Sequence, residues 1–146
     1  MKEIIVIQIG NDGNNAGFDF WKKVKKEYKI DEEGNYQGNN DAQLENINVY
    51  FGELKNHKYW PRAIIIGDES IIADKLSNFY NISKYPTEYI NQWPDTSKLI
   101  TFIQGVNFYK EKQIELLNPI RKLFESLDCP QGFHIINSAA EGFSSG

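Results

Sequence analysis

Two stretches of small and polar residues each follow a short apolar run, an arrangement that could bind phosphate. Residues 10–17, GNDGNNAG, follow EIIVIQI, and residues 137–146, NSAAEGFSSG, follow GFHII. A bound phosphate needs main-chain N–H groups that it can approach closely, and glycine permits that approach because it lacks Cβ. The two stretches supply a candidate phosphate site made of Gly10, Asn11, Asp12, Gly13, Ser138, Gly142 and Ser144.

Two carboxylates in these stretches oppose phosphate binding. Asp12 lies in the first stretch and Glu141 in the second, so both would stand beside a bound polyanion. Like charges about 4 Å apart repel by roughly 4 kcal/mol at an effective dielectric constant near 20, unless a cation lies between them. In the other interpretation, Gly10 and Gly13 only form a tight strand-to-helix turn, and Asp12 is stabilised by the helix N-terminus.

Residues that could catalyse a reaction do not cluster in the sequence. His57 and His134 are isolated, and a lone histidine beside an apolar strand is usually structural. Cys129, the single cysteine, has no basic neighbour in sequence that would activate it, so we expect an inert core thiol. There is no CxxC, HExxH or Walker motif, and no carboxylate spacing typical of an acid–base pair. The sequence therefore predicts neither a metal site nor a catalytic centre.

The elements that position these residues alternate between strands and helices. Apolar β-branched runs predict strands at Glu3–Ile9, Arg62–Gly67 and Gly132–Ile136. Apolar residues at three-to-four spacing predict helices at 18–28, Ser70–Phe79 and Asn107–Leu127. This order predicts an α/β fold: a three-layer Rossmann-like parallel sheet with helices on both faces, forming a single domain over residues 1–146.

Some segments keep more than one interpretation. The third strand lies either at Tyr89–Trp93 or at Ser97–Ile103, because both have strand-like apolar residues. Pro119 lies inside the last long helix and is expected to kink or divide it. Residues 10–17 are expected to form a Gly/Asn turn, and Ala42–Phe51 a short helical or irregular segment.

Composition and charge limit the classes of partner that the protein is expected to bind. The chain has 146 residues, a formal net charge of −4 and a hydrophobic fraction of 40%, which indicate a globular acidic domain. An acidic balance argues against general nucleic-acid binding, which needs a basic face. No apolar stretch approaches the roughly 18 residues of a transmembrane segment, and no secretory signal is evident. We expect an intracellular protein.

Four segments carry a resemblance to tubulin. They are MKEIIVIQIGNDGNNAGFDFW at residues 1–21, NNDAQLENINVYF at 39–51, KYWPRAII at 58–65 and ESLDCPQGFHIINSA at 125–139. Each resembles a tubulin segment, in the same order and at nearly the same spacing. The resemblance covers this whole chain and the first third of a tubulin. It implies the fold of the tubulin N-terminal domain, with the second tubulin domain absent.

The resemblance also implies a GTP site across the C-terminal ends of the strands, where open α/β sheets bind ligands. The family positions magnesium with an acid-x-acid pattern, of which GDES at residues 67–70 keeps Glu69 and has Gly67 for the first acid. Asp68 is expected to point away from the site, or to cap a helix together with Glu69 and Ser70. Phe143 stands where the family has a phosphate-binding threonine.

The closing EGFSSG differs from the glycine-rich tubulin signature and is similar to the D-G-F-S-G of the misato family, tubulin-like proteins linked to mitochondria. We therefore expect a non-catalytic structural subunit of a larger protein assembly, with a remnant nucleotide site and no retained cofactor. The expected host is a mitochondrial complex, with the cytoplasm as the alternative location. The alternative function is a GTP-binding switch, or a filament-forming tubulin-fold fragment, that keeps GTP and magnesium.

Overall fold

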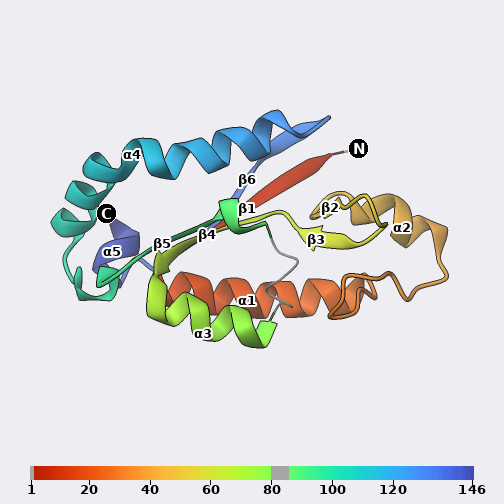
Figure 1. The fold of residues 1–146 in the computed structure, drawn as a ribbon, viewed down its shortest axis with the longest axis horizontal. Helices are drawn as coiled ribbons and strands as arrows, with labels where there is room; N and C mark the ends of the chain where they lie inside the picture. Colours follow the sequence, from red (N-terminus) through yellow and green to blue (C-terminus); the bar gives the residue numbers. More distant parts are fainter. Residues whose placement is uncertain (1, 80–85) are drawn as a thin grey trace.

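The computed structural model describes residues 2–79 and 86–146 (Figure 1). Strands and helices alternate along most of the chain. The strands are β1 (Glu3–Ile9), β2 (Phe51–Glu53), β3 (Tyr59–Pro61), β4 (Ala63–Asp68), β5 (Ile90–Trp93) and β6 (Pro130–Ile136). The α-helices are α1 (Gly10–Glu27), α2 (Asp41–Ile47), α3 (Glu69–Phe79), α4 (Phe102–Glu125) and α5 (Gly142–Ser145). Two 3₁₀ turns, η2 (Thr87–Tyr89) and η3 (Thr96–Lys98), flank β5.

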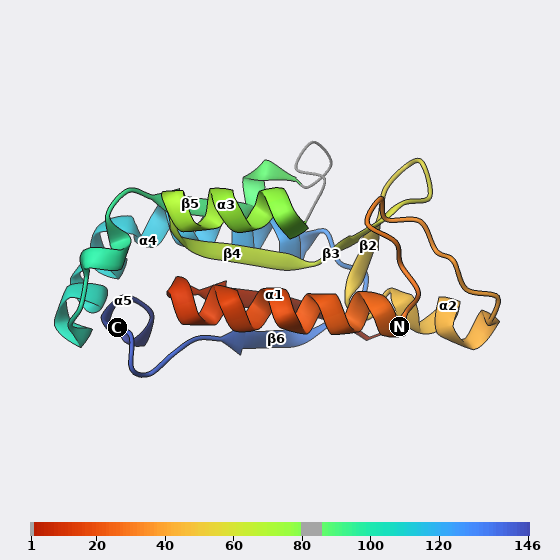
Figure 2. The same ribbon diagram turned by 90° about the horizontal axis from the view of Figure 1, so that it is seen from below.

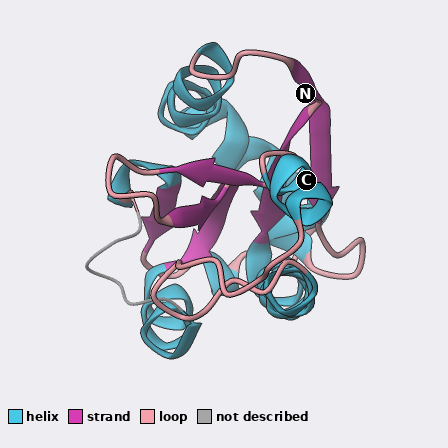
Figure 3. Cartoon of the chain, turned by 90° about the vertical axis from the view of Figure 1, so that its right-hand side faces the viewer, coloured by secondary structure: helices cyan, strands magenta, loops and turns pink. Residues whose placement is uncertain are grey.

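The main sheet has four strands in the order β5-β4-β1-β6, and every neighbouring pair is parallel. Helices α1 and α3 cover one face of this sheet, and α4 lies over the other (Figures 1 and 2). Figure 3, turned so that the sheet is seen between its helices, shows the same layers. The predicted α/β fold with a parallel sheet and flanking helices is therefore confirmed.

The central strands are apolar along almost their whole length because both of their faces are covered. β4 is buried at every residue, and β1 is buried at five of seven positions. Between the sheet and α1, the fully buried Trp21 makes edge-to-face contacts with Phe20, Tyr50 and Phe51. Burying a large aromatic side chain contributes on the order of 2–3 kcal/mol. This face is the tightly packed part of the core.

A buried ion pair holds the N-terminal ends of the strands. Arg62 Nη2 lies 2.6 Å from Glu3 Oε1, and the other oxygen of Glu3 accepts a hydrogen bond of 2.8 Å from the main-chain N–H of Cys129. Arg62 also donates to the main-chain oxygen of Asn48. The pair thus joins β1 to the segments that precede β4 and β6.

The structure decides between the two candidates for the third strand. The strand is β5, within the predicted Tyr89–Trp93, whereas residues 97–103 form part of η3 and the start of α4. A capping box explains the difference: the Thr101 hydroxyl accepts from the N–H of Gln104, and Gln104 Oε1 accepts from the N–H of Thr101. The end of the apolar run SKLITFI therefore begins helix α4 and does not form a strand.

Several further expectations need correction. No turn separates β1 from the first helix, because α1 begins at Gly10 and includes the whole stretch GNDGNNAG. Pro119 does not divide α4, which is one helix from Phe102 to Glu125. The antiparallel hairpin of β2 and β3 was not predicted, since both strands are only three residues long. Cys129 is partly exposed rather than a core thiol.

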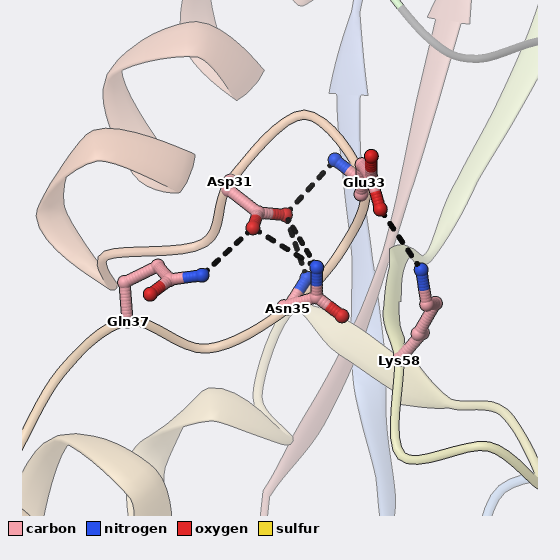
Figure 4. Close-up of polar contacts among 5 residues, drawn as sticks. All are labelled: Asp31, Glu33, Asn35, Gln37 and Lys58. Atoms are coloured by element: carbon pink, nitrogen blue, oxygen red, sulfur yellow. Dashed lines mark hydrogen bonds and ion pairs between the residues drawn. The ribbon is translucent and has the colours of Figure 1, made fainter.

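The polar loop after α1 is organised by one carboxylate (Figure 4). Asp31 accepts hydrogen bonds from the main-chain N–H groups of Glu33 and Asn35, and from the side-chain amides of Asn35 and Gln37. Burial by itself raises the pKa of Asp31, but these bonds outweigh it and lower the pKa to about 2. Lys58 reaches Glu33 at 3.4 Å and joins the loop to the β2–β3 hairpin.

Candidate functional site

The side chain of Glu141 lies on the N-terminus of α1, at the C-terminal end of the sheet. Its Oε1 accepts a hydrogen bond of 2.8 Å from the N–H of Asn11, and its Oε2 one of 3.3 Å from the N–H of Asp12. Gly10, with φ +78°, makes the approach possible, because a Cβ at this residue would stand 2.4 Å from Oε2 of Glu141. Gly10 is the first residue of α1, and its missing Cβ leaves room for the Glu141 carboxylate.

This contact places an anion where a helix offers its free donors. The first N–H groups of an α-helix have no partner within the helix, and the helix dipole favours negative charge beside them. A phosphate and a carboxylate meet the same chemistry there. In this protein the donors of Asn11 and Asp12 already have an acceptor, which is the chain's own Glu141.

The other candidates in the closing stretch bond to one another. The hydroxyl of Ser144 donates to the main-chain oxygen of Ser138 at 2.9 Å and lies 3.4 Å from Oε2 of Glu141. The N–H of Ser138 donates to the Ser144 hydroxyl at 3.3 Å. The residues around Glu141 are therefore joined in one hydrogen-bonded cluster with the start of α1.

Two candidate glycines serve close packing. A Cβ at Gly142 would lie 2.1 Å from the carbonyl carbon of Ile100 and 2.3 Å from the nitrogen of Thr101. A Cβ at Gly13 would lie 2.7 Å from the main-chain oxygen of Ile136. Both glycines are thus explained by contacts between main-chain segments of this chain.

A second carboxylate, that of Asp68, accepts hydrogen bonds at the C-terminal end of β4. One oxygen of Asp68 accepts from the N–H and hydroxyl of Ser70 at 3.2 and 2.7 Å, and the other from the N–H and hydroxyl of Ser97 at 3.1 and 2.9 Å. Burial alone raises the pKa of Asp68, but the bonds from Ser97 and Ser70 lower it to about 2. The expectation that Asp68 caps a helix is confirmed by its bonds from Ser70. The bonds from Ser97 in η3 were not predicted.

Glu69 does not join either cluster. It is exposed at the first position of α3, and it makes no hydrogen bond or ion pair within the part of the chain that the structure describes. Across the same residues, no group of three or more His, Cys, Asp and Glu side chains is arranged to hold a metal ion. The structure therefore brings together the candidates of the first and last stretches, but not Glu69.

Three aromatic side chains fill the space between the loops that follow β5 and β6. Phe108 of α4 packs edge-to-face on Trp93, with ring centroids 5.2 Å apart, and on Phe143, with centroids 5.1 Å apart. Phe143 is only 7% exposed. The phenylalanine that stands in the closing stretch is thus a core residue, and it anchors α5 against α4.

Sequence reasoning missed a buried amide pair next to this site. Gln8 donates from Nε2 to Oδ1 of Asn14 at 3.0 Å, and Asn14 donates from Nδ2 to the main-chain oxygen of Ile66 at 2.9 Å. Gly17 makes room for the pair, because a Cβ there would lie 2.3 Å from Oε1 of Gln8. A glutamine inside the apolar run EIIVIQI was the available signal, since a buried amide needs a partner.

Comparison with known proteins gives a consistent result. The family model described as the Tubulin/FtsZ family, GTPase domain, matches residues 3–146. The chain is 35% identical over 158 aligned positions to the tubulin beta-6 chain of Gallus gallus and 34% identical to the tubulin beta-3 chain of Echinococcus multilocularis. Both alignments cover 100% of this chain and 33% of the relative, so the chain spans about a third of their length. Among the described residues, no helix is long and apolar enough to cross a membrane.

Proposed function

Because this chain belongs to the Tubulin/FtsZ family through its GTPase domain, we propose that it is a non-catalytic structural subunit of a protein assembly, with a nucleotide site that no longer holds GTP. The observation that carries the proposal is the contact of Glu141 with the N-terminus of α1. That carboxylate takes the main-chain donors that a phosphate would need.

A phosphate that binds at the N-terminus of α1 has to displace the Glu141 carboxylate. The displaced carboxylate stays close and repels the phosphate, because both are negatively charged. The cluster also binds Glu141 through Ser144, and Asp12 adds a second carboxylate in the first turn of α1. Repulsion between unit charges about 4 Å apart is on the order of 4 kcal/mol at an effective dielectric constant near 20. This cost is large beside the binding free energy of a typical metabolite, about 8 kcal/mol at a micromolar Kd.

Among the residues that the structure describes, we expect no catalytic group at this end of the sheet. Of the acids that lie there, Glu141 and Asp68 accept structural hydrogen bonds, and Asp12 and Glu69 stand in the first turns of α1 and α3. His134 lies on β6 and packs edge-to-face on Phe20, with ring centroids 5.3 Å apart. The proposed subunit therefore binds its partners without turning over a nucleotide.

Equilibrium dialysis with GTP and magnesium, together with thermal unfolding, tests the proposal. A ligand that binds only the native state stabilises it by about 2.7 kcal/mol at 100 times its Kd, so true binding raises Tm. We expect no retention and no Tm increase for the native protein. Glu141→Ala frees the two donors and should increase retention, whereas the control Glu125→Ala, which changes an exposed carboxylate on α4, should not. Retention of GTP by the native protein would overturn the proposal.

The second candidate function is a GTP-binding switch or a filament-forming tubulin-fold fragment. It is favoured by the first glycine-rich stretch with Gly10 and Gly13, by Glu69, which belongs to the family's acid-x-acid pattern, and by the serines Ser144 and Ser145. The dialysis experiment separates the switch from the scaffold. Sedimentation with and without GTP separates a filament-forming fragment, which would pellet only with nucleotide.

The host assembly is proposed from the closing EGFSSG, whose resemblance to the misato family points to a mitochondrial complex. The alternative host is a cytoplasmic assembly. Affinity purification of the tagged full-length protein from separated mitochondrial and cytoplasmic fractions tests both. Stable co-purification of other subunits from the mitochondrial fraction is expected, and recovery from the cytoplasmic fraction alone would favour the alternative.

A further inference from the structure

The segments at the C-terminal ends of the strands are tied to one another by side chains of this chain. In the sheet order β5-β4-β1-β6, each pair of neighbouring strands leads into segments that share a hydrogen-bonded link. Two of these links are made by the carboxylates of Glu141 and Asp68, and one by the amide of Asn14. The end of the sheet where open α/β folds bind ligands is thus crossed by internal bonds.

The first link joins the segments that follow β6 and β1. Oε1 of Glu141 accepts from the N–H of Asn11 at 2.8 Å, and Oε2 accepts from the N–H of Asp12 at 3.3 Å. These two N–H groups lie in the first turn of α1 and have no acceptor within the helix. Glu141 is also the N-cap residue of α5, yet within the described chain its side chain makes no capping bond to α5. Its carboxylate therefore serves a helix start that is 130 residues away in the sequence.

The other two links lie on the β4 side of the sheet. The Asn14 side chain on α1 donates to the main-chain oxygen of Ile66 at 2.9 Å, which ties the start of α1 to β4. One oxygen of Asp68 accepts from the N–H of Ser70 at 3.2 Å, in the first turn of α3. The other oxygen accepts from the N–H of Ser97 at 3.1 Å, in η3. Helices α1 and α3 therefore both have a carboxylate of the chain at their first turn, and each carboxylate joins that turn to the segment after a neighbouring strand.

An apolar contact closes the same end of the sheet on the α4 face. Phe108 packs edge-to-face on Trp93, at the end of β5, and on Phe143, in the segment after β6, with ring centroids 5.2 and 5.1 Å apart. Phe143 and its neighbour Gly142 are buried. The segments after the two outer strands are thereby connected through α4, so the closing stretch is held by polar contacts toward α1 and by apolar contacts toward α4.

A bound anion would make the same kind of link as Glu141. Phosphates bind at helix N-termini because free N–H donors and the helix dipole favour negative charge there. A ligand that bridges two segments orders them only while it is bound, whereas a carboxylate that belongs to the chain is always present. Tethering gives such a group an effective concentration on the order of millimolar or more. The internal carboxylates therefore hold this end of the sheet in one arrangement without a ligand.

We propose that Glu141 is a built-in substitute for a bound anion, which keeps the segment after β6 closed on α1 at all times. The inference rests on the proposed loss of the nucleotide site and adds how that site is regulated: its conformation does not respond to nucleotide. A partner subunit that binds at the strand ends then contacts the same surface with or without GTP. Loss of the carboxylate should make this arrangement depend on an added anion.

Amide hydrogen exchange at Asn11 and Asp12, followed by NMR, tests the proposal with inorganic phosphate as the added anion. Because these N–H groups have no acceptor within α1, their protection reports on Glu141 or on an anion in its place. The native protein, Glu141→Ala and the control Glu125→Ala, which changes an exposed carboxylate on α4, are compared. Each is measured in potassium chloride and in potassium phosphate of equal ionic strength.

The native protein and the control should show the same protection in both salts. In chloride, Glu141→Ala should lose protection at Asn11 and Asp12 by roughly tenfold, which corresponds to about 1.4 kcal/mol. In phosphate, the variant should regain most of it, because the anion binds the freed donors. Circular dichroism checks that each variant is folded. If Glu141→Ala does not fold, Glu141→Gln, which keeps the size and removes the charge, is measured in its place and should show a smaller loss that phosphate also restores.

Three results would overturn the proposal: equal protection of the native protein and the variant in chloride, protection of the native amides only in phosphate, or no recovery of the variant in phosphate. The dialysis experiment separates this failure from that of the proposed function. A variant that phosphate does not protect, together with a native protein that rejects GTP, would exclude the built-in anion and leave the loss of the nucleotide site intact. Retention of GTP by the native protein would overturn both.

Discussion

The two faces of the sheet are closed to very different degrees. Toward α1 and α3, the side chains of Trp21, Phe51 and Ile72 are fully buried, and a ring contact between Trp21 and Phe51 connects α1 to β2. Toward α4, a cavity of about 310 Å³ remains and Ile135 is 58% exposed. The same apolar strands serve both faces, so within the described residues the difference lies in the helices: α1 and α3 close one face, and α4 leaves a cavity on the other.

The largest effect is expected on the closed face. Trp21→Ala should lower the free energy of unfolding by about 3–5 kcal/mol, because the site is fully buried and cannot collapse around the lost ring. Urea unfolding followed by circular dichroism measures the change. A loss below about 1 kcal/mol would mean that the two faces are equally loose, and the comparison would fail.

The ion pair between Glu3 and Arg62 at the N-terminal ends of the strands is expected to stabilise the sheet itself. Arg62→Ala leaves the Glu3 carboxylate buried without its partner and should cost about 3 kcal/mol. The double variant Glu3→Gln with Arg62→Met should recover part of this loss, since no unpaired charge remains. Urea unfolding of both variants measures the two losses, and equal losses in the single and double variants would contradict this expectation.

Acid should weaken the C-terminal ends of the strands by a smaller amount. The pKa of Asp68 is about 2 in the folded protein and near 3.8 when unperturbed, so its contribution is present above pH 4 and is lost as the pH falls toward 2. We expect a loss on the order of 1–2 kcal/mol over this window. Asp68→Asn should flatten this part of a pH titration of Tm, and an unchanged slope would exclude a role for Asp68.

The smallest effect is expected on the open face. Leu117→Ala should change the free energy of unfolding by less than about 1 kcal/mol, because Leu117 is 43% exposed and borders a cavity. Urea unfolding followed by circular dichroism measures the change. A loss as large as that of Trp21→Ala would show that the α4 face is closed in solution.

The sequence was sufficient for the fold class, whereas the candidate site stays a prediction. Short β-branched runs and amphipathic spacing placed β1, β4, β6 and three helices, because burial of apolar residues at fixed periods is a local signal. The β2–β3 hairpin was not predicted, α4 was expected to begin at Asn107 instead of Phe102, and the expected alternative that Pro119 divides α4 was wrong. These depend on caps and short pairings that a periodic pattern does not contain.

For the candidate site, the sequence indicated the residues but not the hydrogen bonds between them. It determined that Gly10, Asp12 and Glu141 occur at strand ends, because residue type and order are local facts. Only the tertiary structure decided that Glu141 accepts from the first turn of α1, 129 and 130 residues away in the chain. Hydrogen bonds between segments this far apart depend on the packed sheet that brings two strand ends together, and no spacing rule along the chain encodes that approach.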